Sequence, residues 1–374
     1  MMKSGKISQI VEAVKPKLAK RAAEHDAENR FVEAGYGLLK SHGFFGAGVP
    51  EALGGLGASH AELCDALRSL AQACPATALA ASMHTHLVAA TVWKHLRGAG
   101  GEPLLRRIAK EQLVLVSTGA GDWLESNGKL ESVDGGYALT AKKQFCSGSP
   151  MGDLLVTSSV FESPSEGAQV FHFAVPFSAK GVSIGADWDT LGMRGTGSQT
   201  VELEGVFIPE ASVVLKRPRA GWHPVWSTVL TVAPPIYMSP YLGVAEAARD
   251  RAIDWAKTHV RAETPLLVGE LENALAAARI TWKHLIANAA EYDFAPELER
   301  ANRALVAKTL LANAVIQTVE KAMEVVGGAA YFRRMGIERL LRDVHGAPNH
   351  PLPERRQQML TGRLALGLDP LSGG

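Results

Sequence analysis

Apolar side chains recur at helical spacing in the first quarter and the last third of the chain. Near the N-terminus one stripe runs through Ile10, Val11, Val14 and Leu18, and another lies within residues 31–39. Spacings of three and four residues place side chains on one face of an α-helix. Both stretches therefore predict amphipathic helices.

A turn and a further helix start follow in VPEALGGLGASHAEL. Three glycines predict the turn, and Ser59 with Glu62 three residues later has the spacing of a capping box. Another helix is predicted over about 77–96. Residues 8–96 therefore predict a mainly helical segment.

From about residue 113 the pattern changes to short apolar or alternating runs separated by small polar residues. Such runs predict β-strands, and no helical stripe returns until about residue 226. We place a β domain at 112–217. The strand-like runs are LVLVST, GYALTAKKQFC, LLVTSSVF, VFHFAVPF and VELEGVFIP.

The last third again predicts helices, over about 242–260 and 268–292 and in a third, more regular segment. An apolar residue returns every seven positions in that segment, which is the spacing of a helix-bundle seam. The repeated residues are Leu298, Leu305, Ala312, Val319 and Val326.

Composition limits the classes of function. The 374 residues are 47% hydrophobic and 21% charged with a net charge of +1, which is typical of a soluble protein of two or three domains. A near-neutral chain gives no basis for a nucleic-acid partner or an anionic membrane surface. Three cysteines without metal-ligand spacing predict no metal site. The absence of an apolar signal core or a membrane-spanning run predicts a cytoplasmic protein.

The stretch 187–210 carries the strongest candidate chemistry. Residues 191–198, LGMRGTGS, form a glycine-rich polar turn that feeds an alternating strand ending at Pro209. Such a turn places backbone N–H and hydroxyl groups at a sheet edge, where a ligand can use them. An ordinary hairpin loop would have the same composition, so the residues alone leave both interpretations open.

Three separated motifs make the chain resemble the acyl-CoA dehydrogenase superfamily. They are LGMRGTGS followed by a strand and IPE, the turn VPEALGGLG, and VVGGAAYFRRMGIERLLRD. The GTGS form is similar to the flavin-dependent monooxygenases that share the fold. The resemblance implies an α+β fold with an N-terminal helical domain (1–111), a central β-barrel-like domain (112–217) and a C-terminal four-helix bundle (218–374). It also implies a homotetramer or homodimer.

The same resemblance implies a flavin, FAD or FMN. Ser147 in KKQFCSGS falls where the family carries a Thr or Ser that can hydrogen-bond flavin N5. Ser117 and Thr118 occupy the place of a segment that lines the flavin. The resemblance places Thr196 and Ser198 near the flavin diphosphate or the substrate.

Two further sets of residues are candidates for the pyrophosphate. Arg194 has the fork geometry to pair with a phosphate, or it braces the β domain against the bundle. Gly327 and Gly328 would allow close approach of a dinucleotide. However, His259 and Glu324 stand where the family has Arg and Gln. These departures favour weak FAD binding or a reduced flavin used as an exchangeable substrate.

The usual catalytic carboxylate is missing. An acyl-CoA dehydrogenase needs a base against the carbon α to the thioester. Pro351 stands where most members carry the Glu, and the alternative seat in WSTVLTVAPPIYMSPYLG contains no acidic residue. His350 instead stands where monooxygenases of this fold carry a histidine. His84 or His86 would supply a second imidazole.

The sequence therefore favours a flavin-dependent monooxygenase-like oxidoreductase using reduced flavin and oxygen, with Ser147 and His350 at the flavin. An alternative is an acyl-CoA or acyl-carrier-protein dehydrogenase with an atypical base, such as His350. A third is a binding protein that has lost catalysis. The expected partners are a small-molecule or acyl-thioester substrate and either a flavin reductase or an electron-transfer flavoprotein.

Overall fold

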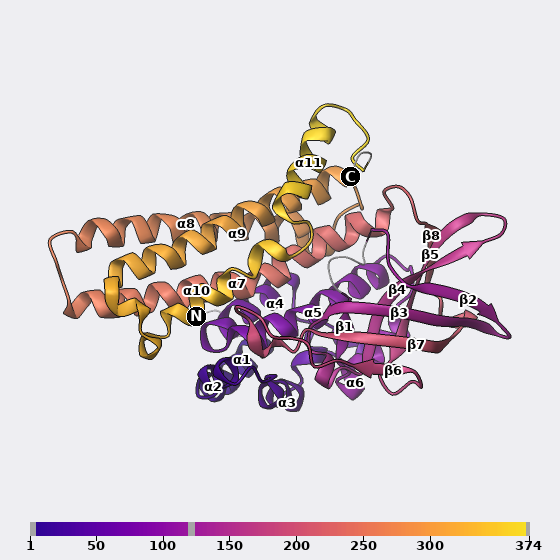
Figure 1. Cartoon of the computed structure of the whole chain (residues 1–374), viewed down its shortest axis with the longest axis horizontal. Helices are drawn as coiled ribbons and strands as arrows, with labels where there is room; N and C mark the ends of the chain where they lie inside the picture. The colour runs from indigo at the N-terminus through magenta and orange to yellow at the C-terminus, as the bar shows by residue number, and fades with distance from the viewer. Residues whose placement is uncertain (1–4, 119–123, 372–374) are drawn as a thin grey trace.

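The computed structural model describes residues 5–118 and 124–371, and in chain order it runs from helices through a sheet to helices again (Figure 1). The first group of helices precedes the sheet and includes the predicted 77–96 segment, which begins two residues earlier. These helices are α1 (Lys6–Ala19), α2 (Ala22–Ala27), α3 (Glu33–Ser41), α4 (His60–Ala73), α5 (Pro75–Leu96) and α6 (Glu102–Glu111).

Local sequence signals in this first group are confirmed. Val11, Val14 and Leu18 are buried along one face of α1, as the stripe predicted. Ser59 caps α4: its hydroxyl accepts from the Glu62 N–H, and the Glu62 carboxylate accepts from the Ser59 N–H. This reciprocal pair satisfies two backbone donors that the helix itself leaves open.

The central strands form one open sheet, so the expected barrel-like closure is wrong. The described strands are β1 (Leu115–Ser117), β2 (Lys129–Val133), β3 (Gly136–Cys146), β4 (Leu154–Ser163), β5 (Gly167–Pro176), β6 (Val182–Ile184), β7 (Gln199–Pro209) and β8 (Leu215–Pro218). Their order is β6-β7-β3-β2-β4-β5-β8, with β1 paired to β4. β6 and β8 are the two ends of this order and do not pair with each other, so the described strands do not close into a ring.

The C-terminal helices are α7 (Pro224–Thr258), α8 (Thr264–Ala289), α9 (Leu298–Val326), α10 (Ile337–Val344) and α11 (Glu354–Ala365). The seven-residue repeat of α9 is buried from Leu305 onward, which confirms it as a packing seam. α7 begins 18 residues before the predicted start at 242 and includes Pro234, Pro235 and Pro240. Burial on nearly every side of this segment outweighs the hydrogen bonds that the prolines remove.

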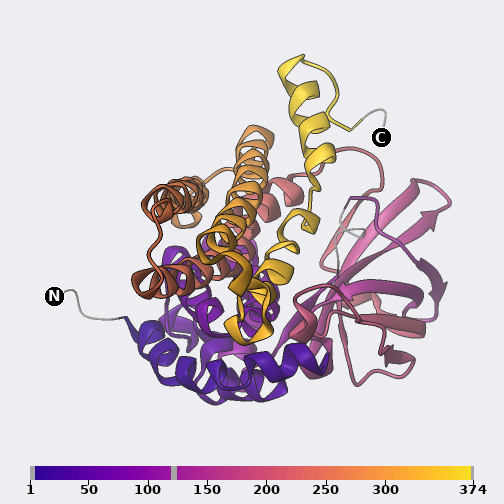
Figure 2. The ribbon, with the colours of Figure 1, turned by 60° about the vertical axis from the view of Figure 1, so that its left-hand side comes forward.

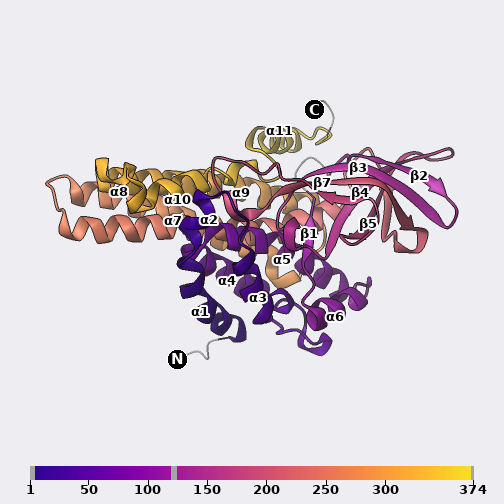
Figure 3. The ribbon, with the colours of Figure 1, turned by 60° about the horizontal axis from the view of Figure 1, so that its bottom comes forward.

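The sheet, the N-terminal helices and the C-terminal helices occupy different regions of the molecule. Figures 1 and 3 place the sheet at one end of the molecule and the long helices at the other, with α1–α6 along one side. Turning the molecule shows α11 projecting beyond the long helices (Figure 2), with Leu360 in one apolar cluster with Ala301 and Leu305 of α9. The C-terminal part, for which a four-helix bundle was expected, consists of three long helices with the shorter α10 and α11. None of the described helices has both the length and the apolar character to cross a membrane.

A buried carboxylate joins three of these helices. Glu246 on α7 is 2% exposed and accepts hydrogen bonds from Arg68 and Gln72 of α4, both at 2.8 Å, and from Arg279 of α8 at 2.9 Å. A buried charge is tolerated when every lone pair is engaged in this way. The network therefore links the N-terminal helices to the bundle.

A second junction connects the glycine-rich turn to α10. The Met193 N–H donates to the buried Asp343 carboxylate at 2.5 Å, and Arg342 pairs with Asp26 of α2 at 2.6 Å. A Cβ added to Gly192 would lie 2.1 Å from the Arg342 carbonyl oxygen. Only glycine permits this approach of two backbones.

We therefore expect Gly192→Ala to lower the free energy of unfolding by about 3 kcal/mol, because the clash is with backbone that cannot rotate away. Urea denaturation of both proteins measures the difference. Gly269→Ala is the control: nothing lies within 4 Å of its added Cβ inside α8, so stability should rise by up to about 1 kcal/mol. Equal stabilities of the two variants would contradict the role of Gly192.

Candidate functional site

A cavity of about 660 Å³, here called the central pocket, lies where α5, the sheet, the glycine-rich turn and the C-terminal helices meet. Its apolar wall includes Leu79, Met83 and Leu230. Its polar lining consists of hydroxyl and imidazole groups together with one guanidinium and one amide. The candidate residues that line it are His86, Ser117, Thr118, Ser147, Thr196, Ser198 and His350.

An irregular strand end brings Ser147 to this pocket. The register between β3 and β7 shifts between Lys143 and Cys146, and Phe145 adopts a left-handed backbone with φ +60°. A bulge of this kind re-aims the side chains that follow it. Phe145 is left 54% exposed, and Ser147 faces the pocket.

Three hydroxyls form a chain with a defined direction. Thr196 Oγ1 donates to the Met193 carbonyl at 2.9 Å, so it accepts from Ser198 Oγ at 2.7 Å. Ser198 has then used its only proton and accepts from Ser147 Oγ at 2.7 Å. The free lone pairs of Ser147 are consequently left to accept a hydrogen bond from a donor in the pocket.

His350 is held by two tyrosines of α7. Tyr241 Oη lies 2.8 Å from His350 Nε2, and the Tyr237 ring stacks on the imidazole with centroids 4.8 Å apart. Burial raises the pKa of Tyr241 well above 10, so the phenol keeps its proton and donates it to Nε2. Burial also lowers the pKa of His350 to about 3. The ring is therefore neutral, with its proton on Nδ1.

Lys308 of α9 orders the segment that carries His350. Its Nζ donates to the carbonyls of Pro348 at 3.1 Å and Leu352 at 3.2 Å, on either side of the histidine. The side chain is buried, and burial lowers its pKa to about 8. Lys308, Tyr237 and Tyr241 were not predicted from the sequence as site residues. The four-residue spacing of the two tyrosines was the available signal.

The two candidate histidines of α5 have different environments. His86 lines the central pocket, and burial lowers its pKa to about 4. His84 lies outside it: Nε2 donates to the Phe45 carbonyl at 2.8 Å, and Nδ1 accepts from the Leu115 N–H at 2.9 Å. Both nitrogens of His84 thus tie α5 to neighbouring backbone, and the expectation that His84 serves the site is corrected to a structural role.

Arg194, Gly327 and Gly328 also do not line the central pocket. Arg194 pairs with Asp189 at 3.0 Å and donates to the carbonyls of Asp26 and Thr190, so it braces the turn. The two glycines follow α9 in a 3-10 turn (Gly327–Tyr331). The remainder of the segment that begins at Thr118, residues 119–123, lies outside the described residues.

No carboxylate occurs among the described residues that line the pocket. Pro351 lines it at the position expected for the missing base. Within the ranges 5–118 and 124–371, no group of three or more potential ligands is placed to hold a metal ion. The pocket therefore offers imidazoles and hydroxyls for chemistry, and the guanidinium that lines it, Arg342, is already paired with Asp26.

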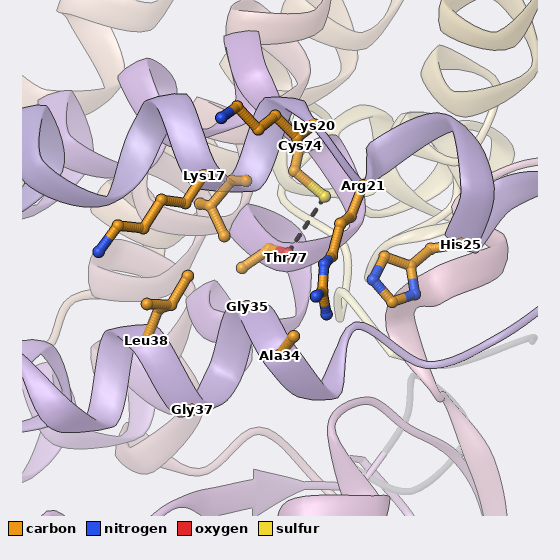
Figure 4. A pocket seen from close by; sticks show the side chains of 11 residues that line it. Lys17, Lys20, Arg21, His25, Ala34, Gly35, Gly37, Leu38, Cys74 and Thr77 are labelled. Atoms are coloured by element: carbon orange, nitrogen blue, oxygen red, sulfur yellow. Dashed lines mark hydrogen bonds between the residues drawn. The ribbon is translucent and has the colours of Figure 1, made fainter.

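A separate cleft of about 530 Å³ lies among α1, α2, α3 and the start of α5 (Figure 4). Its cations are Lys17, Lys20 and Arg21, and the Thr77 hydroxyl donates to the Cys74 sulfur in its wall. None of the candidate residues contributes to it. The central pocket is therefore the candidate site.

The central pocket fits a flavin ring. Its volume lies within the range of cofactor sites, about 300–1,000 Å³. The lining combines apolar side chains and the half-buried Trp188 with a few oriented polar groups, among them the acceptor Ser147. These are the features that hold a planar ring with polar edges.

We expect Thr196→Val to lower the free energy of unfolding by about 1–3 kcal/mol, because the buried Ser198 hydroxyl loses its acceptor and the Met193 carbonyl loses one of its donors while side-chain volume is kept. Chemical denaturation measures this loss. Thr281→Val on exposed α8 removes a comparable hydroxyl as a control. Equal losses in both would contradict the importance of the hydroxyl chain.

Acid should destabilise the protein. The folded-state pKa values of His350, His84 and His86, about 3 to 4, lie below the unfolded value of 6.5, so the unfolded chain binds more protons as pH falls below 6.5. Burial raises the pKa of Asp343 to about 6, so this carboxyl binds a proton more readily in the folded chain than in the unfolded chain. Its protonation offsets the destabilising effect of one of the three histidines. Unfolding free energies at pH 7 and pH 5 test this. His350→Asn should lose less stability over that interval, and an unchanged loss would contradict the assignment.

Comparisons with known proteins agree with this geometry. Residues 7–112 match the acyl-CoA dehydrogenase N-terminal domain, and residues 236–353 match the C-terminal domain. An amino sugar nitrososynthase of Streptomyces rubradiris is 29% identical over 354 residues, which covers 88% of this chain and 82% of that protein. A dibenzothiophene monooxygenase of Rhodococcus erythropolis is 27% identical over 365 residues, covering 86% and 84%.

Solved structures lead to the same family. KijD3, in complex with FMN and dTDP-3-amino-2,3,6-trideoxy-4-keto-3-methyl-D-glucose, superimposes with a TM-score of 0.88 at 25% identity. The match covers 98% of this chain and 95% of that one. The chain belongs to the acyl-CoA dehydrogenase superfamily, and it is a flavin-dependent oxidoreductase.

Proposed function

We propose that this protein oxygenates a small, electron-rich substrate with reduced flavin and molecular oxygen. One observation carries the proposal: the described lining of the central pocket holds the imidazoles of His86, His345 and His350 but no carboxylate. The nitrososynthase and monooxygenase relatives support it. A reduced flavin supplies two electrons, so that one oxygen atom enters the substrate and the other leaves as water.

The hydroxyl chain favours the reduced flavin. Because Ser147 is left as an acceptor, it pairs with a donor in the pocket. We expect flavin N5 to lie beside this hydroxyl, as the family resemblance implies, and N5 would carry a proton only in the reduced ring. Thr196 and Ser198 thus act through Ser147 as positioning residues.

His350 supplies a hydrogen-bond donor to oxygen bound in the pocket. Because the Tyr241 hydroxyl donates its hydrogen bond to Nε2, the ring proton of His350 is on Nδ1. Nδ1 has no hydrogen-bond partner among the described residues. A neutral N–H can donate to a developing oxyanion and then return to its starting state. Lys308 and Tyr237 hold the ring in place, and His86 brings a further neutral imidazole to the pocket.

Dehydrogenation of an acyl-CoA fits the pocket less well. That reaction needs a base strong enough to remove the proton α to a thioester. With pKa values of about 3 and 4, His350 and His86 are weak bases. The ordered hydroxyl chain likewise argues against a protein that has lost catalysis.

We also propose that a flavin reductase delivers the reduced flavin and that the cytoplasmic protein is a homodimer or homotetramer. Large apolar side chains on α8 and α9 support the assembly, because they are exposed without cover in one chain. They are Leu266 (67% exposed), Ile280 (69%) and Leu310 (56%). Gly327 and Gly328 do not line the central pocket of their own chain. In such an assembly they are available to a ligand bound to an adjacent subunit.

The proposal is tested by supplying chemically reduced FMN and oxygen with a panel of amino compounds and sulfur heterocycles, and by identifying the products by mass spectrometry. Incorporation of one labelled oxygen atom from O₂ is the expected result. In parallel, an acyl-CoA is added to the flavin-loaded protein with an artificial electron acceptor. Bleaching of the flavin by the acyl-CoA would overturn the proposal.

We expect His350→Ala to reduce substrate oxygenation about 100-fold or more, because the donor to bound oxygen is lost. Flavin affinity should stay close to that of the unsubstituted protein, and oxygen should then be released as hydrogen peroxide. Product yield and peroxide release measure the two outcomes. His284→Ala, an exposed histidine of α8, is the matched control. Full oxygenation by His350→Ala would remove this histidine from the mechanism.

A further inference from the structure

A second large cavity, here called the arginine cavity, adjoins the central pocket. It measures about 1,120 Å³ and lies among α2, the C-terminal part of α7, the 3-10 turn Arg333–Met335 and α10. Thr190, Leu191 and Arg342 line both cavities. A ligand in one is therefore next to a ligand in the other.

The arginine cavity carries an excess of positive charge. Its carboxylates are already engaged: Asp26 and Glu338 pair with Arg342 at 2.6 and 2.9 Å, and Asp254 pairs with Lys257 at 3.0 Å. Six arginines face these three carboxylates. They are Arg194, Arg251, Arg333, Arg334, Arg339 and Arg342. Four of the six, excluding Arg194 and Arg342, have no ion pair within the described chain.

Two of these four are withdrawn from solvent. Arg339 is 8% exposed, and its Nε and Nη1 are buried without a hydrogen-bond partner in the described part of the chain. Arg251 donates to the Gly336 carbonyl at 2.7 Å. Burial and then the charge of Arg339 lower the pKa of Arg251. A buried guanidinium and a half-buried one that repel each other are costly unless an anion lies between them.

Gly336 makes the arrangement possible. Its φ is +65°, and an added Cβ would lie 2.4 Å from Arg251 Nη1. The turn therefore leaves room for the guanidinium beside the start of α10. Trp255, stacked on His259, adds a half-buried aromatic surface to the same cavity.

We propose that Arg251 and Arg339 form a phosphate-binding subsite that opens beside the flavin pocket. Guanidinium groups bind phosphate oxygens through paired, charge-assisted hydrogen bonds, and a phosphate would neutralise both side chains at once. The ligand is a phosphate ester whose remaining part lies along Trp255 or reaches past Leu191 toward the central pocket. This inference extends the proposed function, but it rests on the cavity and not on the reaction.

The test measures phosphate binding by thermal unfolding, with inorganic phosphate compared against chloride at equal ionic strength. We expect phosphate to raise the unfolding midpoint of the unsubstituted protein. Arg251→Gln should weaken the phosphate affinity at least about tenfold, the effect of losing one charged pair. Without phosphate it should be at least as stable as the unsubstituted protein, because repulsion with Arg339 is removed.

Arg107→Gln on exposed α6 changes the net charge equally and is the matched control. Arg339→Gln provides a second variant on the other side of the subsite. No stabilisation by phosphate beyond that by chloride would overturn the proposal. So would equal stabilisation of Arg251→Gln and Arg107→Gln. Loss of folding without phosphate in both Arg251→Gln and Arg339→Gln would show a structural role instead.

Comparing FMN with riboflavin identifies the source of the phosphate. If the flavin supplies it, FMN binds more tightly than riboflavin, and Arg251→Gln removes that difference. If a second ligand supplies it, the ratio of the two affinities is unchanged and inorganic phosphate still binds the FMN-saturated protein. These experiments measure unfolding midpoints and affinities and do not depend on turnover. Their results therefore remain interpretable if the oxygenation proposal fails.

Discussion

The close contact between the glycine-rich turn and α10 is the constraint on which the site depends. Gly192 permits the two backbones to touch, and the buried Asp343 carboxylate accepts the next N–H, that of Met193. The Met193 carbonyl then orients Thr196 and, through Ser198, Ser147. One contact between the bundle and the sheet thus sets the direction of a hydroxyl inside the pocket.

Burial determines the protonation states on the opposite side of the pocket. The α7 tyrosines and the buried Lys308 hold His350 neutral and select which nitrogen carries its proton. Acyl-CoA dehydrogenation requires a strong base at this place, whereas oxygen transfer requires a donor that is present at neutral pH. The same fold can therefore support different chemistry after a carboxylate is replaced by an imidazole nearby.

Charge is distributed unequally between the two adjoining cavities. The central pocket is mainly neutral, and its Arg342 is already paired with Asp26. The arginine cavity concentrates guanidiniums whose nearest carboxylates are engaged elsewhere. A ligand with an uncharged reactive part and an anionic group matches this distribution of charge. Its uncharged part would lie in the neutral pocket, and its anionic group would pair with guanidiniums and so would not be desolvated without a partner.

The sequence by itself determined the local elements and the family. The stripe of α1, the capping box at Ser59 and the seam of α9 depend on neighbours within a few residues, so spacing was sufficient to predict them. The missing carboxylate was also readable, because the motif around Pro351 defines its place. Ser147 and His350 were predicted from family motifs, and His86 was predicted as one of two alternatives for a second imidazole; all three line one pocket.

Only the tertiary structure decided what depends on residues far apart in the chain. His84 and His86 are two residues apart on α5, and packing against Phe45 and Leu115 decides which one reaches the pocket. The long α7 likewise results from burial that overrides local propensity. The position of Met193, whose carbonyl directs the hydroxyl chain, and the tautomer of His350 follow from contacts across more than 100 residues, which no local pattern encodes.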